Sequence, residues 1–240
     1  MGIFRSRWFM AAALLALLTA CAAPQKLALD TQKRQSIKHV ALVQIPEPTT
    51  YGMDPGAMPG GAALYVFGAL GGAILGGIEA SRHEAATKQF MSTLEPTPPA
   101  LGKLMADQLE AGLLAKGYTV TRVAMPPKMP DGKEYDFSKL GVEHDVVLLT
   151  ELGAGYAVEG KTVGPRVRLV ASLHARGSKE KLFSDGYVYG NAKWGEMVWI
   201  ERDPRFALPS MEAVYGSPAI AVEGMREGAR KLTERLVADL

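Results

Sequence analysis

The spacing of hydrophobic and polar positions divides much of the chain into strand-like and helix-like segments. Residues 39–45 form a nearly continuous β-branched run that ends at Pro46, which is typical of a strand buried on both faces. Residues 101–113 place apolar side chains at helical spacing up to Gly117, and residues 118–123 return at once to strand-forming residues. The pattern therefore predicts strand, helix and strand in that order.

The second half of the chain carries the clearest strand pattern. Residues 166–176 alternate apolar and polar side chains, which indicates one face in the core and one mostly solvated. Residues 145–152 are predicted to form another interior strand, and residues 181–190 to pair with 166–176 as an antiparallel hairpin. An irregular stretch over residues 191–217 leads to a final helix, which Ser217-Pro218 should cap. The predicted buried stripe of this helix consists of Met225, Ala229, Leu232, Leu236 and Leu240.

Together these elements predict an α/β (α+β) fold with a mixed sheet of about five strands and two or three packing helices. We expect a single periplasmic domain over residues 36–240, with a glycine-rich apolar helical insertion over residues 55–94 after the first strand. The polar end of that insertion, residues 79–94, is compatible with a helix that leaves the apolar zone.

The apolar part of the insertion is the most unusual stretch of the sequence. Residues 55–78 contain no charge and eight glycines, and Gly68, Gly72 and Gly76 would form one bare ridge on a helix. Residues 60–78 would span roughly 28 Å, close to the ~30 Å thickness of a bilayer's hydrocarbon core. The ridge resembles the glycine zippers of envelope lipoproteins, so it predicts helix packing or self-association. Bilayer insertion and a glycine-rich helix or loop against a soluble domain remain alternatives.

The amino terminus predicts export and lipid anchoring. A basic start with Arg5 and Arg7 precedes an apolar run too short to span a membrane, and Leu18-Thr19-Ala20-Cys21 follows. This segment resembles the lipobox of bacterial lipoproteins. The resemblance implies a signal peptide over residues 1–20, a diacylglyceryl thioether on Cys21, and acylation of the new amino terminus by a fatty acid such as palmitate. Two or three acyl chains would give a durable membrane anchor.

The anchor also bears on location and charge. Residues 21–35 are expected to be a lipidated tether, and Ala22 after the cleavage site implies outer-membrane delivery, with the domain facing the periplasm. Loss of residues 1–20 removes two arginines and no acid, which leaves 25 basic and 25 acidic residues. A balanced charge argues against nucleic acid as a partner. Because Cys21 is the only cysteine, no disulfide framework is expected.

The order of elements carries a second resemblance. The strand at residues 39–45, the helix and strand over residues 101–123, and the strands over residues 145–190 resemble the α/β domains of lipoproteins related to the curli secretion channel and to the amino-terminal domain of TolB. This resemblance implies an accessory or assembly role rather than catalysis. The glycine-rich insertion departs from it, which puts a ring-shaped channel in doubt.

Candidates for catalysis and metal binding are weak. The four histidines lie far apart in sequence, none at metal-ligand spacing, and are expected at the surface or at sheet edges; they are His39, His83, His144 and His174. Gly153-Ala154-Gly155 follows a strand but continues into strand residues, where a dinucleotide site needs a helix. Glu151 and Glu159 could lie near each other on the meander. We therefore predict no enzyme activity, no cofactor and no metal.

Five side chains form the predicted partner surface. Arg166, Arg168 and Arg176 could provide a basic stripe for anionic headgroups or glycan, although a solvated sheet face is the simpler explanation. Trp194 and Trp199 could anchor a partner or cover a sheet edge. Three function classes follow: an envelope assembly or scaffold lipoprotein, which we favour; a periplasmic binding module for glycan, lipid or peptide; and an unrecognised hydrolase.

Overall fold

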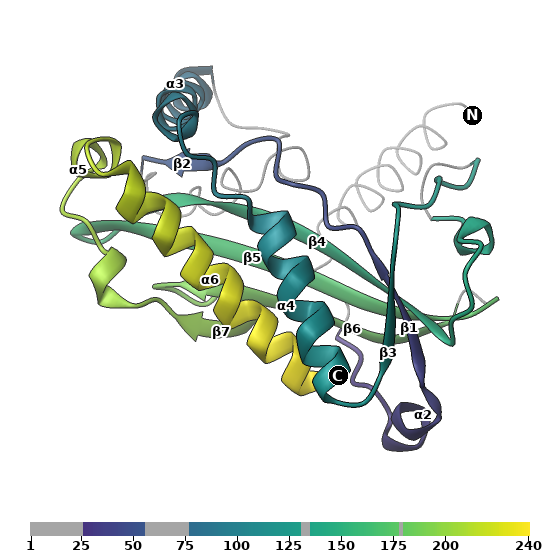
Figure 1. The fold of residues 1–240 in the computed structure, drawn as a ribbon. Helices are drawn as coiled ribbons and strands as arrows, with labels where there is room; N and C mark the ends of the chain where they lie inside the picture. Colours follow the sequence, from purple (N-terminus) through teal and green to yellow (C-terminus); the bar gives the residue numbers. More distant parts are fainter. Residues whose placement is uncertain (1–25, 56–76, 131–134, 178–179) are drawn as a thin grey trace, which may run out of the picture.

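A seven-stranded mixed sheet forms the centre of the domain in the computed structural model, which describes residues 26–55, 77–130, 135–177 and 180–240 (Figure 1). The strands are β1 (His39–Val43), β2 (Gly52–Asp54), β3 (Thr119–Val123), β4 (Val146–Glu159), β5 (Thr162–Ala175), β6 (Lys181–Gly190) and β7 (Val198–Glu201). Their order is β3-β1-β4-β5-β6-β7, and β2 pairs with the second half of β4. The β4–β5–β6 meander is antiparallel, whereas β1 runs parallel to β3 and β4, and β7 parallel to β6. The predicted α/β fold is confirmed.

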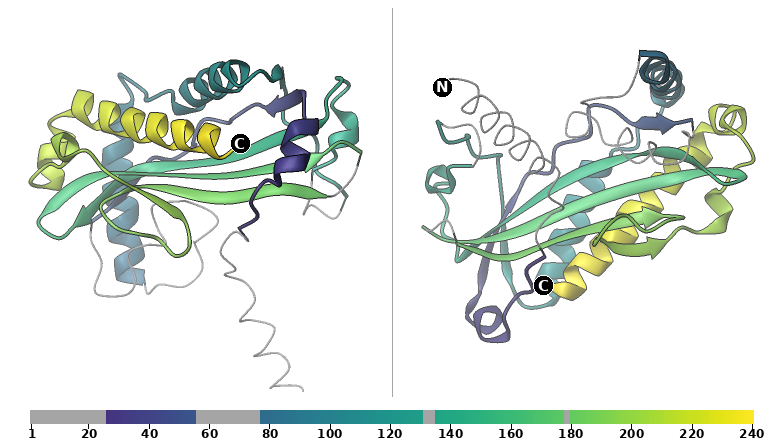
Figure 2. Two further views of the ribbon diagram at one scale, coloured as in Figure 1. Left: turned by 90° about the horizontal axis from the view of Figure 1, so that it is seen from below. Right: turned by 180° about the vertical axis from the view of Figure 1, so that it is seen from behind.

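Two helices, α4 (Leu101–Ala115) and α6 (Pro218–Asp239), lie side by side on one face of this sheet (Figures 1 and 2). The helices over the described residues are α2 (Thr31–Ser36), α3 (Gly77–Leu94), α4 (Leu101–Ala115), α5 (Met211–Tyr215) and α6 (Pro218–Asp239), with short 3-10 turns η3 (Phe137–Lys139) and η4 (Pro204–Phe206). Arg226 in α6 donates to the carbonyl of Pro99, and Lys116 donates to the carbonyl of Ala238, so α4 and α6 run in the same direction. Over the described residues, no helix combines the length and apolar character needed to cross a bilayer.

The main core lies between these helices and the sheet. The predicted stripe of α6 is buried at every position from Met225 to Leu240. Close approach depends on glycine: a Cβ at Gly228 would lie 2.6 Å from Tyr189 Cδ1 and 2.7 Å from Val167 Cγ2. Alternation along β5 then directs Val167 toward α6 and the arginines beside it toward the opposite side, which we call the second face.

The second face carries a smaller apolar cluster. Ala41, Val43, Val123 and Val147 are buried there, at the end of the sheet formed by β3, β1 and β4. Half-buried side chains from the segment that holds η3 pack against them, among them Phe137. The sheet is therefore packed on both faces at this end.

Two short strands account for the difference between about five predicted strands and the seven observed. β2 has three residues and β7 has four, and β7 lies within the stretch expected to be irregular. Such short segments give too few alternating positions for a pattern to emerge. The glycine ridge of Gly68, Gly72 and Gly76 lies outside the described residues. The polar helix predicted for residues 79–94 is present as part of α3.

The segment expected to be a tether packs against the domain from residue 27 onward. Leu27 pairs with Ser184 of β6, and the Asp30 side chain accepts hydrogen bonds from the first backbone amides of α2. Lys33 forms an ion pair with Glu180, and Arg34 donates to the Asp239 carbonyl. These polar contacts form across long sequence separations, so hydrophobic spacing gives no sign of them.

Candidate functional site

The predicted partner surface is assembled on the second face. Arg168 of β5, Val188 of β6 and Trp199 of β7 are in register across three strands and so share a face. Arg166 lies two residues before Arg168 and therefore points to the same side. The structure thus brings together four of the five predicted side chains, and we call Arg166, Arg168, Trp194 and Trp199 the arginine–tryptophan surface.

Arg168 and Trp194 form the centre of this surface. The Arg168 guanidinium lies 5.4 Å from the centroid of the Trp194 ring, a cation–π contact. Burial lowers the pKa of Arg168, and the charge of Glu151 partly opposes that shift. Trp194 itself is half-buried, so part of its ring remains available to a partner.

An ion network fixes the edge of the arginine–tryptophan surface. The Glu159 carboxylate forms ion pairs with Arg166 and, at 3.3 Å, with Arg202, and it accepts a 3.1 Å hydrogen bond from the Asn191 amide. Arg202 also donates to the Thr162 hydroxyl at 2.7 Å. All three charged side chains are nearly buried, with 5 to 12% of their surface exposed. Two arginines share one carboxylate, so the cluster retains net positive charge.

Arg202 was not expected at this site. It follows β7, and no spacing in the sequence links it to Glu159. Gly164 permits the arrangement, because a Cβ there would overlap the Arg202 guanidinium. A glycine facing an arginine from another strand leaves no signal in the sequence without the strand register.

Trp199 has a more structural role, and Arg176 is an exposed residue that lies apart from the arginine–tryptophan surface. The indole of Trp199 donates to the Gly190 carbonyl at 3.0 Å, which ties β7 to the end of β6. Arg176 lies eight residues beyond Arg168, about 26 Å along the strand direction. Its backbone amide donates to the Asp145 carbonyl. The rings of Phe137 and His174, tilted by 44° with centroids 4.9 Å apart, lie between Arg168 and Arg176. The three predicted arginines therefore do not form one continuous stripe.

The histidines differ in part from the expectation. His39 is half-buried beside Asp145, and His174 is half-buried under Phe137. His83 and His144, by contrast, are 6% and 5% exposed, so the prediction of surface or edge positions is wrong for these two. His83 lies 3.9 Å from Asp54, which is 1% exposed, and His144 interacts with the Val142 carbonyl at 2.8 Å. A polar partner makes the burial of each possible: for His83 it comes from β2, and for His144 it lies two residues earlier in the same segment.

Paired acids and metal ligands are not brought together in the described part of the chain. Glu151 is exposed near the middle of β4, whereas Glu159 lies at its end within the ion network. Gly153-Ala154-Gly155 lies inside β4, as expected for strand residues. Among the described residues, no group of three or more His, Cys, Asp or Glu side chains could hold a metal ion.

A cavity of about 330 Å³ lies where β1 and β3 end, beside the start of α4. Ala100, which precedes α4, has a φ of 54° and provides no side-chain cap. Glu47 caps the helix instead, because its carboxylate accepts from the amides of Leu101 and Gly102 at 2.8 and 2.7 Å. Tyr51 also donates to Glu47, and burial together with this carboxylate raises the pKa of Tyr51. The helix end that could attract an anion is thus already occupied by a carboxylate.

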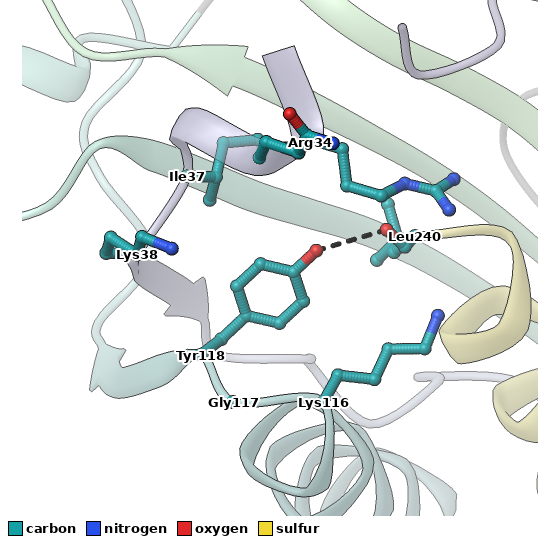
Figure 3. A pocket seen from close by; sticks show the side chains of 8 residues that line it. Arg34, Ile37, Lys38, Lys116, Gly117, Tyr118 and Leu240 are labelled. Atoms are coloured by element: carbon teal, nitrogen blue, oxygen red, sulfur yellow. Dashed lines mark hydrogen bonds between the residues drawn. The ribbon is translucent and has the colours of Figure 1, made fainter. Parts of the chain in front are cut away.

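A second cavity, of about 300 Å³, lies near the other ends of β1 and α4, and Figure 3 shows the side chains that line it. Four segments surround it: α2, the residues before β1, the turn between α4 and β3, and the end of α6. Its lining residues are Arg34, Gln35, Ile37, Lys38, Lys116, Gly117, Tyr118 and Leu240. Sequence reasoning missed this site because its three cationic side chains come from segments about 80 residues apart.

Neither a known protein-family model nor a curated protein matches this chain. The sequence, the fold and the side-chain geometry are therefore the grounds for the function proposed below.

Proposed function

We propose that this chain is a lipid-anchored envelope lipoprotein that performs no catalysis and acts in assembly, as a scaffold or secretion-accessory factor. Acylated Cys21 would hold it at the outer membrane, with the domain facing the periplasm. Other envelope proteins would be its partners, and self-association through the glycine-rich segment is a second route to assembly.

The gathering of Arg168, Trp194 and Trp199 on the second face is the observation that carries this proposal. Arginine and tryptophan are the residue types that most often dominate protein interfaces. The Glu159 network holds the supporting loop in place, so the surface would lose little conformational entropy on binding. Among the described residues, α4 and α6 cover the opposite face, whereas Arg168, Trp194 and Trp199 each keep part of their side chain exposed on the second face.

A binding module for glycan, lipid or peptide is the second candidate. The contact between Arg168 and Trp194 favours it, because an aromatic ring beside a cation also suits sugars and anionic headgroups. Such a module would bind its ligand without forming a stable protein complex, which separates it from the assembly role.

The anchor is tested by Cys21→Ser in the native host, because a hydroxyl cannot replace the thiol in diacylglyceryl transfer. Intact-mass analysis should show an acylated chain beginning at Cys21 in the wild type and an unprocessed chain in the variant. Fractionation should place the wild type in the outer membrane. An unlipidated Cys21 would contradict the anchor, and inner-membrane recovery would contradict the location.

The assembly role is tested by the native mass of the acylated protein in detergent after mild crosslinking in cells. Wild type should give discrete complexes larger than one chain, and Arg168→Ala should reduce them. Lys88→Ala on α3, an exposed lysine outside the surface, is the matched control. Recovery of wild type as a single chain would favour the binding module instead.

A further inference from the structure

The cavity in Figure 3 combines a small volume with an unusual density of positive charge. Its 300 Å³ is at the lower end of the range for ligand pockets, so it has room for a headgroup-sized molecule. Arg34, Lys38 and Lys116 all line it. Among the described residues of the lining there is no aspartate or glutamate.

Two carboxylates close to the lining residues already accept hydrogen bonds. Asp239 accepts from the Tyr187 hydroxyl at 3.0 Å and from Arg235 at 3.0 Å. Asp145 accepts from the backbone amides of Lys38 and His39 at 2.7 and 2.8 Å. Neither carboxylate lines the cavity.

The end of α6 supplies partial negative charge to the cavity. Arg34 donates to the Asp239 carbonyl at 2.8 Å, Lys116 to the Ala238 carbonyl at 3.2 Å, and the Tyr118 hydroxyl to the Leu240 oxygen at 3.2 Å. A helix carboxyl end offers about half an elementary charge. The combined positive charge of Arg34, Lys38 and Lys116 exceeds this partial charge together with any charge that the Leu240 main chain could supply.

Two observations indicate that this positive charge is incompletely matched. The Arg34 Nε atom is buried and has no hydrogen-bond partner among the described residues. Burial and the nearby Arg34 lower the pKa of Lys116, and the Asp239 charge only partly opposes them. An anion in the cavity would reduce the repulsion between the Arg34 and Lys116 cations.

The floor of the cavity limits what could bind. Ile37, Tyr118 and Leu240 also line a small apolar cleft of about 10 Å³, which is barely the space of one water molecule. An acyl chain cannot enter there, so the occupant is a polar group.

We propose that this cavity binds an anionic phosphate group, supplied by a lipid headgroup or by a free phosphate-bearing molecule. Arginine and lysine together are the usual protein ligands of phosphate. The lipid source rests on the proposed function. If Cys21 is acylated, the nine residues from it to Asp30 reach at most ~32 Å, so α2 and the cavity lie close to the bilayer surface.

The test measures how fast each lysine is acetylated by an amine-reactive ester, read by mass spectrometry on the acylated full chain in dodecyl maltoside micelles. Inorganic phosphate is added in one arm, with chloride at equal ionic strength as its control, and phosphatidylglycerol is added to the micelles in another. Lys38 and Lys116 should be acetylated about fivefold more slowly once the site is four-fifths occupied. Lys88, exposed on α3, should not change.

The Arg34→Gln variant distinguishes binding in this cavity from a general effect of additives on surface lysines. In this variant, phosphate or lipid should no longer slow the acetylation of Lys38 and Lys116. General adsorption of detergent or lipid would slow it equally in the wild type and the variant, and that result would overturn the proposal. Protection by phosphatidylglycerol identifies a headgroup as the source, and protection by inorganic phosphate alone identifies a free ligand. Protection in neither arm also overturns the proposal. If Cys21 proves to be unacylated, the proposed membrane anchor is wrong. The arm with inorganic phosphate still tests whether the cavity binds a phosphate group.

Discussion

The two faces of the sheet are held in different ways. On the face that α4 and α6 cover, apolar side chains at regular spacing are buried, and Gly228 lets the helix approach Tyr189 and Val167. On the second face, Glu159 joins Arg166 of β5 and Arg202 just after β7, and Arg168 lies over the Trp194 ring. The helix-covered face is stabilised by many buried apolar side chains at regular spacing, whereas the second face depends on a few specific polar partners. This contrast supports the proposal that the second face binds a partner.

The largest expected effect is on the helix-covered face. Leu232→Asp would place a charge at a position that is 0% exposed, at a cost of about 4 kcal/mol or more. Glu234→Gln, two residues away on the exposed side of α6, should change the free energy of unfolding by less than about 0.5 kcal/mol. Urea unfolding followed by circular dichroism measures both. Equal midpoints would mean that the burial of α6 is misassigned.

A smaller but still large effect is expected from the ion network. Glu159→Ala would leave Arg166 and Arg202 nearly buried without their carboxylate, which should destabilise the fold by about 3 kcal/mol. The matched control is Glu151→Ala on the same strand, where the side chain is exposed and the cost should stay within about 0.5 kcal/mol. If the two variants unfold at the same urea concentration, the second face does not depend on this network.

Close packing on the helix-covered face predicts an effect of about 1 to 3 kcal/mol. Gly228→Ala would force a methyl group against Tyr189 and Val167, which are both fully buried and cannot move away. Gly190→Ala is the control, because its Cβ would come no closer than 3.7 Å to Arg166. Thermal melts should show a lower midpoint for Gly228→Ala and an unchanged or slightly raised one for Gly190→Ala. The reverse order would show that α6 packs loosely.

The smallest effect on stability is expected at Trp194. The ring is half-buried and its contact with Arg168 is worth about 0.5 to 1 kcal/mol, so Trp194→Ala should cost roughly 1 kcal/mol. Phe206→Ala on the helix-covered face, where the ring is buried, should cost about 3 kcal/mol. Chemical denaturation compares the free energies of unfolding of the two variants. A loss for Trp194→Ala as large as that for Phe206→Ala would show that Trp194 is a core residue.

Regular spacing explains which parts of the fold could be predicted. The stripe from Met225 to Leu240 repeats with the period of a helix, and β5 alternates with the period of a strand, so each segment carries its own evidence. β7 could not be recognised in the same way, because Val198–Glu201 offers only four positions. The burial of His83 depends on β2, which the sequence did not indicate.

The candidate sites were only partly predictable for a related reason. Arg168 and Trp199 could be named because each stands out within its own segment, but their common face required the register of three strands. The Glu47 cap of α4 and the cavity around Arg34 and Lys116 join segments that lie 54 and 82 residues apart in the sequence. No local sequence pattern indicates that two such distant segments come into contact.

The most direct test of the proposed function compares photocrosslinking from the two sides of the domain in intact cells. A photoreactive amino acid at position 193, beside Trp194, should give discrete adducts with envelope proteins, several-fold more than the same group at position 231 on the exposed side of α6. Both native residues are exposed lysines. The adducts at 193 should disappear in the Trp194→Ala background. Equal yields from both positions, or adducts that persist without Trp194, would contradict the assignment of the second face as the binding surface.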